Sequence, residues 1–319
     1  MALARDLIRG SALDRVEVAD AMALAAHASY ARTIRCDGGN ADQLAAELPR
    51  FTSLRGLHLG TLLSDQVASA LVGAIDLREL TAGCSGLTDA GVFALGQLPS
   101  LRKLVVFGDA SMIRGQTLPT LRQLQCLRIA SPLKPRLGSS ANHQQENHRQ
   151  LVHAMVRLPD LQELQFVLER MPQTTREARE LVVQPLTCLP NLRRLGLVLI
   201  HGKLSPYIEQ IASRPLTHLH LGCESLTAAN AAHLARNASL RELDLSGVHF
   251  DDVDAAVASL AKMTGLQRLG VAHVNLTFAH RQLLLAALPG CLIETAFRDP
   301  NGEWCLLGET AKRHDPRRR

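Results

Sequence analysis

Residues 240–276 read LRELDLSGVHFDDVDAAVASLAKMTGLQRLGVAHVNL, and this stretch contains one pattern twice. An apolar triplet at positions one, four and six begins at Leu240 and returns at Leu266, which is 26 residues later. Alternation at positions four and six suits a short strand with one buried face. The intervening DDVDAAVASLAKM starts with acidic residues and continues with apolar residues at helical spacing. The pattern therefore predicts one strand and one helix in each repeat.

The triplet recurs along most of the chain. The first apolar positions of ten successive repeats are Ala31, Leu54, Leu77, Leu101, Leu124, Leu161, Leu192, Leu216, Leu240 and Leu266. Their spacings are 23, 23, 24, 23, 37, 31, 24, 24 and 26 residues. Over residues 31–297 the chain resembles the leucine-rich repeat family, and the segments from Leu77 and Leu240 look like its ribonuclease-inhibitor-like subtype. The resemblance implies an α/β solenoid, with a curved parallel sheet on the concave side and helices on the convex side.

One departure from the family concerns the ninth position of each repeat. The family often has Asn there to satisfy backbone groups in the turn, whereas this chain has residues such as Ser85, Asp109 and Val248. The Asn ladder is therefore degenerate.

The repeats define the expected domains. We expect an N-terminal helical cap at residues 1–30, about ten repeats at 31–291, a C-terminal cap hairpin at 292–308 and a basic tail at 309–319. The alternative for the first segment is a secretion or targeting signal. The two long intervals contain insertions at residues 132–150 and 170–186, which leave the same end of adjacent strands. They form either a functional lip on one rim or tolerated loop growth.

Composition restricts the compartment and the class of protein. The seven cysteines are scattered and form no C-x-x-C, which favours reduced thiols and argues against structural zinc. No stretch approaches the apolar length of a membrane span. We expect a cytoplasmic protein, or one delivered into a host cell without a cleaved N-terminal signal peptide. The chain resembles repeat-only proteins of Gram-negative bacteria, including type III secreted effectors.

Motifs for catalysis are missing from the sequence. There is no G-x-S-x-G, no Gly-rich phosphate loop with Lys and no H-E-x-x-H. His218 and His220 share one face of a predicted strand, where surface contacts are a better interpretation than a metal site. We therefore predict a non-enzyme without cofactors or metal.

Basic residues concentrate at the strand positions that point away from the core. Arginine occupies position two in six of ten repeats, and positions two, three and five together carry eleven basic and four acidic residues. The predicted partner-binding residues are Arg32, Arg35, Arg55, Arg78, Arg102, Lys103, Arg128, Arg193, Arg194, His218, His220, Arg241 and Arg268. A structural alternative is that the arginine stems cover neighbouring apolar surface.

This surface predicts a protein–protein interaction module that binds an acidic protein through its concave face. Nucleic acid is less favoured, because base-stacking aromatics are scarce and glutamates interrupt the basic residues. We expect a monomer. The second functional hypothesis is a substrate adaptor for a ubiquitin-ligase machinery.

Overall fold

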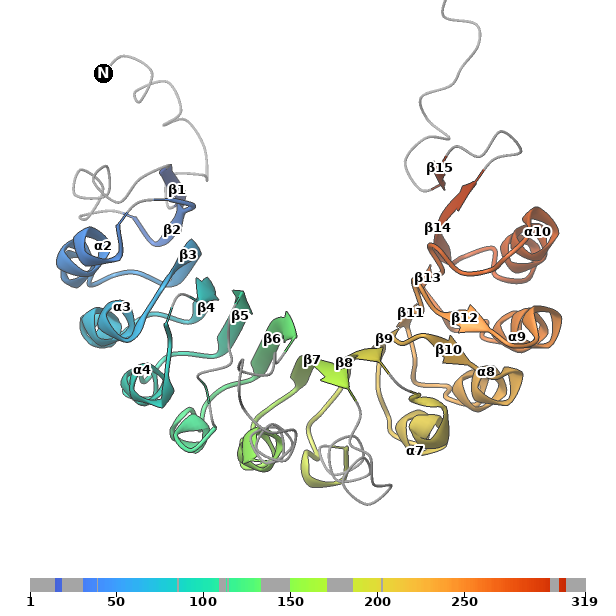
Figure 1. Cartoon of the computed structure of the whole chain (residues 1–319), viewed down its shortest axis with the longest axis horizontal. Coiled ribbons are helices and arrows are strands. Elements are labelled where there is room, and N and C mark those ends of the chain that lie inside the picture. Colours follow the sequence, from blue (N-terminus) through green and yellow to red (C-terminus); the bar gives the residue numbers. More distant parts are fainter. Residues whose placement is uncertain are drawn as a thin grey trace, which may run out of the picture. The chain divides into compact units, whose positions relative to one another are not determined.

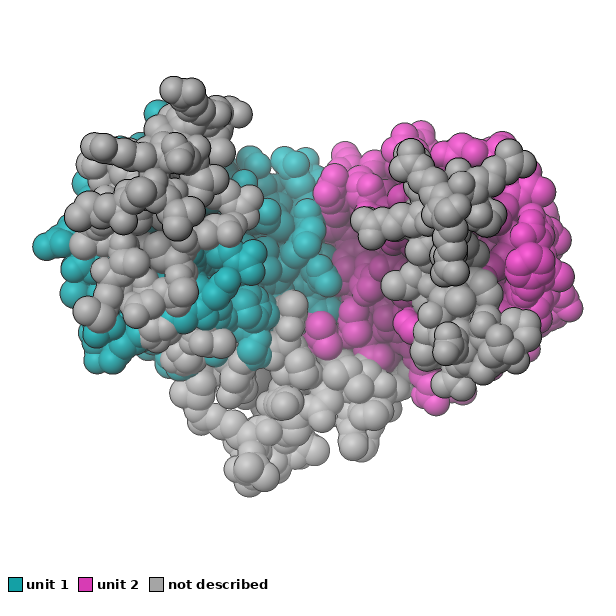
Figure 2. All heavy atoms as spheres, turned by 90° about the horizontal axis from the view of Figure 1, so that it is seen from above, with its two compact units in different colours: residues 1–166, 187–191 teal, residues 167–186, 192–319 magenta. Residues whose placement is uncertain are grey.

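The computed structural model describes residues 15–18, 31–38, 40–84, 86–108, 113, 115–132, 150–170, 186–201, 203–298 and 304–307. The predicted insertions and the basic tail lie almost entirely outside these ranges. The chain divides into two compact units, coloured separately in Figure 2. Unit 1 comprises residues 1–166 and 187–191, and unit 2 comprises residues 167–186 and 192–319.

The strands of unit 1 follow one another in sequence order within a sheet (Figure 1). They are β1 (Arg15–Val18), β2 (Thr33–Cys36), β3 (Gly56–Leu63), β4 (Glu79–Cys84), β5 (Lys103–Gly108), β6 (Cys126–Pro132) and the start of β7 (Glu163–Arg170). From β1 to β6 every neighbouring pair is parallel. Parallel neighbours require a crossover between them, and the repeats supply it with their helical segments.

The helical segments of unit 1 lie on one side of this sheet (Figure 1). They are α2 (Ala41–Glu47), α3 (Asp65–Ala70) and α4 (Asp89–Leu95), with 3₁₀ turns η2 (Leu48–Arg50), η3 (Leu71–Gly73) and η4 (Leu118–Thr120). Residues 150–155 are also helical. The other side of the sheet carries no helix among the described residues, and we call it the open face.

Part of the N-terminal segment that was predicted as a helical cap, residues 1–30, is instead strand β1. Arg15 pairs with Thr33, so Val16 and Val18 occupy the register positions of Ile34 and Cys36. Two β-branched residues that alternate with polar ones favour a strand, and the free edge of a parallel sheet offers backbone partners. Residues 15–18 therefore extend the repeat pattern by one strand. The remainder of the predicted cap lies outside the described residues.

Unit 2 repeats the same construction. Strands β8 (Arg194–His201), β9 (His218–Gly222), β11 (Glu242–Asp244), β13 (Arg268–Gly270) and β14 (Leu292–Arg298) are parallel in this order, and β15 (Trp304–Leu307) is antiparallel to β14. The helical segments are η5 (Ser205–Tyr207), α7 (Ile208–Ala212), α8 (Ala228–Ala235), α9 (Val253–Leu260) and α10 (Phe278–Ala287). A second, two-stranded parallel sheet joins β10 (Ser225–Leu226) to β12 (His249–Phe250).

The core is formed by the apolar triplet itself. Positions one, four and six of all ten repeats are buried, and none of these side chains is more than 4% exposed. The repeat template is therefore confirmed at every inward position. Burial of this kind is the main favourable contribution to folding. Since each repeat buries its apolar face against the next, the chain is an α/β leucine-rich repeat solenoid.

Backbone hydrogen bonds fix the register at the start of each strand. The carbonyl of Arg32 accepts from the N–H of Arg55 at 2.7 Å and from the N–H of Gly56 at 3.0 Å. The Arg55 carbonyl in turn accepts from Arg78 and Glu79. The same pair of hydrogen bonds starts at position two of eight repeats: Arg32, Arg55, Arg78, Arg102, Gln125, Arg193, Thr217 and Arg241. Consecutive residues at position two are therefore strand neighbours.

Side chains bridge neighbouring repeats where the family's Asn ladder is degenerate. The Asn275 amide accepts from the Phe250 N–H at 3.0 Å and donates to the Phe250 carbonyl at 2.9 Å. The buried Asn237 donates to the Arg214 carbonyl at 2.8 Å and accepts from the Ser239 N–H. Buried backbone groups need such partners, and these amides supply them from other positions of the repeat.

Candidate functional site

The predicted partner-binding residues lie either in the strands or directly before the first residue of a strand. Each is exposed or half-buried. Seven belong to unit 1: Arg32, Arg35, Arg55, Arg78, Arg102, Lys103 and Arg128. Six belong to unit 2: Arg193, Arg194, His218, His220, Arg241 and Arg268. The two sets differ in how their charges are paired.

Four arginines of unit 1 stand at position two of four consecutive repeats, directly before the first residues of β2, β3, β4 and β5. We call Arg32, Arg55, Arg78 and Arg102 the arginine row. The double hydrogen bonds at position two hold their backbones as direct neighbours, about 4.8 Å apart as in any sheet. Within the described part of the chain, Arg55 and Arg78 are exposed and make no hydrogen bond or ion pair through their side chains.

Arginines at position two also contact the turn that precedes their strand. Nη1 of Arg102 donates to Gln123 Oε1 at 2.6 Å and to the Pro99 carbonyl at 3.2 Å. Nη1 of Arg241 donates to the carbonyls of Ala238 at 3.0 Å and Leu240 at 3.1 Å. A guanidinium has five N–H donors. In Arg102 and Arg241, Nη1 therefore holds the turn in place. The other N–H groups of each guanidinium are left for a ligand.

Ion pairs cross between strands elsewhere on the open face of unit 1. Lys103 Nζ lies 3.1 Å from Glu79 Oε2, and these two residues occupy position three of β5 and β4. Arg128 pairs with Glu163 of β7. Arg35 Nε donates to Asp37 Oδ2 at 2.8 Å. These three cations are each paired with an acid, whereas Arg55 and Arg78 have no side-chain partner among the described residues.

Cys126 lies between two of these ion pairs, opposite Lys103 in the register. Burial raises the pKa of its thiol to about 11, and the neighbouring Glu163 carboxylate adds to the rise. The thiol is therefore protonated at neutral pH and is a poor nucleophile.

The open face of unit 2 carries a network of paired charges. His218 Nε2 lies 3.2 Å from Glu242 Oε1, and His220 Nδ1 lies 2.8 Å from Asp244 Oδ2. Nε and Nη2 of Arg268 both donate to Glu294 Oε1, at 3.1 and 2.7 Å. Each of these predicted contact residues is therefore matched by an acid on the next strand. Glu294 lies outside the ten repeats of the sequence template, so sequence reasoning missed it.

Asp244 forms hydrogen bonds with two neighbouring side chains, His220 and Ser246. Its hydrogen bond with His220 holds the pKa of the Asp244 carboxyl far below the ordinary value, and hydrogen bonds from Ser246 act in the same direction. Ser246 Oγ donates to Asp244 Oδ1 at 2.6 Å. Gly270 makes room for this carboxylate, because a Cβ there would lie 2.4 Å from Asp244 Oδ1.

The described residues offer little for metal chemistry or catalysis. No three His, Cys, Asp or Glu side chains within them are grouped so as to hold a metal ion. Ser246 donates to the carboxylate of Asp244 rather than to His220, so these side chains do not form a nucleophile–base relay. No helix in the same part of the chain combines the length and apolar character needed to cross a membrane.

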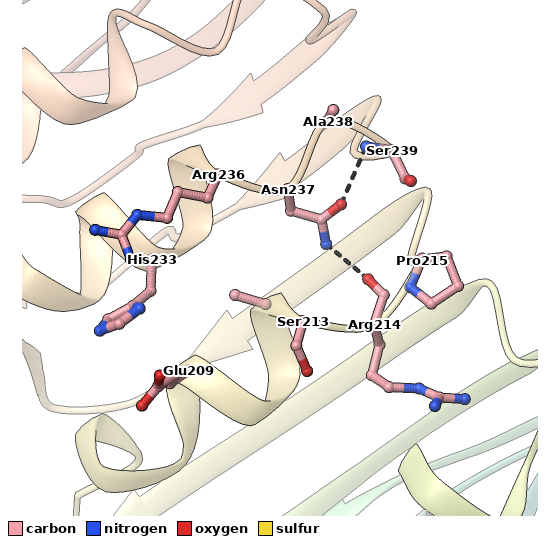
Figure 3. A pocket seen from close by; sticks show the side chains of 10 residues that line it. Glu209, Ser213, Arg214, Pro215, His233, Arg236, Asn237, Ala238 and Ser239 are labelled. Carbon is pink, nitrogen blue, oxygen red and sulfur yellow. Dashed lines mark hydrogen bonds between the residues drawn. The ribbon is translucent and has the colours of Figure 1, made fainter.

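A cavity of about 410 Å³ lies on the helical side of unit 2, between the C-terminal ends of α7 and α8 (Figure 3). Its polar lining includes Glu209, His233 and Arg236. Asn237 lies at one edge, where its amide donates to the Arg214 carbonyl of the preceding repeat and accepts from the Ser239 N–H. The cavity is therefore a gap between two turns with a bracing amide.

Comparisons with known proteins add little to this geometry. No family model matches the sequence, and no curated protein matches it. Among solved structures, the chain is similar to an internalin of Listeria monocytogenes, with 16% sequence identity and a TM-score of 0.41 over 77% of this chain and 74% of the internalin. A likeness of this size supports no conclusion about function. The buried triplets and parallel strands give the chain the fold of a leucine-rich repeat solenoid.

Proposed function

We propose that the chain is a non-catalytic protein-binding module, and that its arginine row docks an acidic surface of a partner protein. The single observation behind this proposal is the succession of arginines directly before four neighbouring strands of unit 1, where backbone hydrogen bonds hold them side by side. Two of them, Arg55 and Arg78, are exposed and lack any counter-charge among the described residues.

The arginine row is electrostatically unfavourable in the isolated protein. Like charges on directly adjacent strands destabilise a sheet. Two charges about 5 Å apart repel by about 1 kcal/mol in water, and by more where the local dielectric constant is lower. An acidic partner would relieve this repulsion. The repulsion between the arginines, which destabilises the isolated protein, thus becomes weaker when the partner binds.

The chemistry of the guanidinium group suits a carboxylate partner. Arginine offers two parallel N–H groups to one carboxylate and is less strongly hydrated than lysine. In Arg102 only Nη1 is engaged by the turn. The row can therefore brace its own turns and bind carboxylates at the same time.

Unit 2 contributes less to this docking surface. His218, His220 and Arg268 face acids on the next strand. A partner would have to break these ion pairs and form new ones with its own acids. Exchange of one exposed ion pair for a similar one contributes little binding free energy. We therefore place the docking of the acidic partner on unit 1.

The proposal is tested with a fluorescein-labelled glutamate-rich peptide. Wild-type protein should bind it with an affinity that falls as salt is added. The double variant Arg55→Glu/Arg78→Glu should lose at least about tenfold in affinity, because a hydrogen bond to a charged group contributes about 1.5–3 kcal/mol. Fluorescence anisotropy measures both.

A matched control is Arg157→Glu/Arg236→Glu, which makes the same change in net charge at two exposed arginines outside the strands. It should reduce affinity only slightly. Equal losses in the two double variants would show a general charge effect and contradict docking at the row. Tighter binding to duplex DNA than to the peptide would identify the row as a nucleic-acid site instead.

A further inference from the structure

An apolar surface lies on the open face of unit 1, beyond the arginine row along the same strands. Position five of β2, β3 and β6 carries Arg35, His58 and Arg128, whereas β5 presents Val105 and then Phe107. Val105, Phe107 and His58 are each half-buried. We call these three residues the aromatic platform.

The platform spans three strands. His58 lies on β3 and Phe107 on β5, yet their ring centroids are 6.4 Å apart with the planes tilted by 32°. Strand β4 lies between them, and it places Gly83 opposite Phe107 and Thr81 opposite His58. Because Gly83 has no side chain, the two rings can approach each other above β4. Gly83 is buried accordingly.

Charged groups surround the platform. Arg128 is the register neighbour of Val105 on β6, and Lys103 precedes Val105 on the same face of β5. On the other side, Asp37 Oδ1 lies 3.7 Å from His58 Nε2. An apolar centre enclosed by a polar rim is the usual composition of a protein interface. Half-buried aromatic and aliphatic side chains gain further free energy when a partner excludes water from them.

From this arrangement we propose that the acidic partner also carries an apolar side chain, which rests on the aromatic platform. The inference rests on the proposed function, since the arginine row supplies the charge complementarity. Arg102, directly before β5, and Phe107 within β5 are five residues apart, which corresponds to about 16 Å along an extended chain. The partner therefore presents an apolar side chain about 16 Å from its acidic group.

Two peptides test this inference. Both carry a glutamate tract, and in both the fifth residue after the tract is varied, with phenylalanine in one and serine in the other. Wild-type protein should bind the phenylalanine peptide about tenfold more tightly or better, because burial of one such side chain corresponds to that ratio or more. Phe107→Ala should bind both peptides with the affinity that wild type has for the serine peptide.

A second variant guards against a folding defect in Phe107→Ala. Val105→Thr keeps the shape of the side chain but replaces one methyl group with a hydroxyl, so it should lower the preference for phenylalanine while thermal unfolding stays close to wild type. In Arg55→Glu/Arg78→Glu, both peptides should bind more weakly and the preference should persist.

The failure of the platform and the failure of the proposed function give different results. Equal binding of the two peptides to wild type would overturn the platform and leave docking at the arginine row standing. Failure of wild type to bind either peptide would overturn the proposed function itself. A preference that survives unchanged in both Phe107→Ala and Val105→Thr would place the apolar contact elsewhere.

Discussion

At the scale of single residues, position eight of some repeats requires an unusual backbone conformation. Position eight of three repeats adopts a left-handed conformation, with φ of +86° at Gly108, +80° at Gly247 and +58° at His273. Glycine adopts this conformation without steric cost, whereas other residues do not. His273 shows that the turn can impose it on a side chain as well.

Gly247→Ala should therefore destabilise the protein by about 1–2 kcal/mol, the cost of a left-handed conformation for a residue with a Cβ. Nothing lies within 4 Å of the position that the new Cβ would occupy, so steric contact adds nothing. Gly290 also has open space but no left-handed φ, and Gly290→Ala is the control. Urea unfolding measures both. Equal losses of stability in Gly247→Ala and Gly290→Ala would show that the left-handed conformation of Gly247 does not affect the stability of the protein.

Asp244 provides a pH-dependent prediction. Its pKa is depressed in the folded protein, first because of the hydrogen bond with His220. A depressed folded pKa contributes stability above the unfolded value of about 3.9, and this contribution is lost as the pH falls through the folded pKa. The side chain is 44% exposed, which limits the contribution.

Asp244→Asn should lower the free energy of unfolding by about 1 kcal/mol at pH 7, the upper range for an exposed pair. The gap to wild type should narrow when the pH is lowered below about 4. Urea midpoints at several pH values measure the gap, and Asp76→Asn, at an exposed aspartate, is the control. A gap that is the same at pH 6 and pH 3 would mean that the charge of Asp244 is unimportant.

At the scale of elements, a side chain of one helix caps the helix of the next repeat. Asp65, the first residue of α3, accepts from the Thr88 N–H at 2.8 Å, from Thr88 Oγ1 at 2.7 Å and from the Gly91 N–H at 2.9 Å. Thr88 is itself the N-cap of α4 and accepts from the Ala90 N–H. The first turn of α4 therefore depends on a carboxylate from the preceding repeat.

Asp65→Ala should cost about 1–3 kcal/mol, because the substitution leaves N–H groups at the start of α4 without an acceptor. Asp42 has a comparable place in the first turn of α2 but is exposed, so Asp42→Ala should cost a few tenths of a kcal/mol from the helix dipole alone. Thermal unfolding with circular dichroism compares the two. Similar losses would contradict the cross-repeat cap.

Most of the elements follow from periodicity, because the inward side chains determine where each strand must lie. Strand β1 also follows from the repeat pattern, because Leu13-Asp14-Arg15-Val16-Glu17-Val18 repeats the triplet with valine at positions four and six. The Lys103–Glu79 pair also follows from the template, since both residues hold position three in adjacent repeats. The platform could not be predicted, because the approach of His58 to Phe107 depends on side-chain directions across a third strand.

At the scale of the whole molecule, each repeat contacts chiefly its neighbours. In such a chain, stability is approximately a sum of repeat and interface contributions. Damage to one repeat should therefore spread only a short way. Leu80 of β4 and Leu243 of β11 are equivalent core residues in different units, exposed by 0% and 1%.

Leu80→Ala should cost about 2–5 kcal/mol in cavity formation and lost burial. Hydrogen exchange should accelerate mainly in β3, β4 and β5, with β11 and β13 little changed. Leu243→Ala should give the converse pattern. A uniform increase along the chain in either variant would show that the repeats unfold as one cooperative unit.

The position-two carbonyls also govern how the molecule yields to mechanical force. Each of these carbonyls accepts hydrogen bonds from the next repeat. When the two chain ends are pulled apart, these hydrogen bonds should therefore break one repeat at a time. The extension should grow in steps of about 80 Å for repeats of 23 or 24 residues, at about 3.5 Å for each residue. The 37-residue interval would give a step of about 130 Å, which would identify that repeat in a single-molecule force–extension curve.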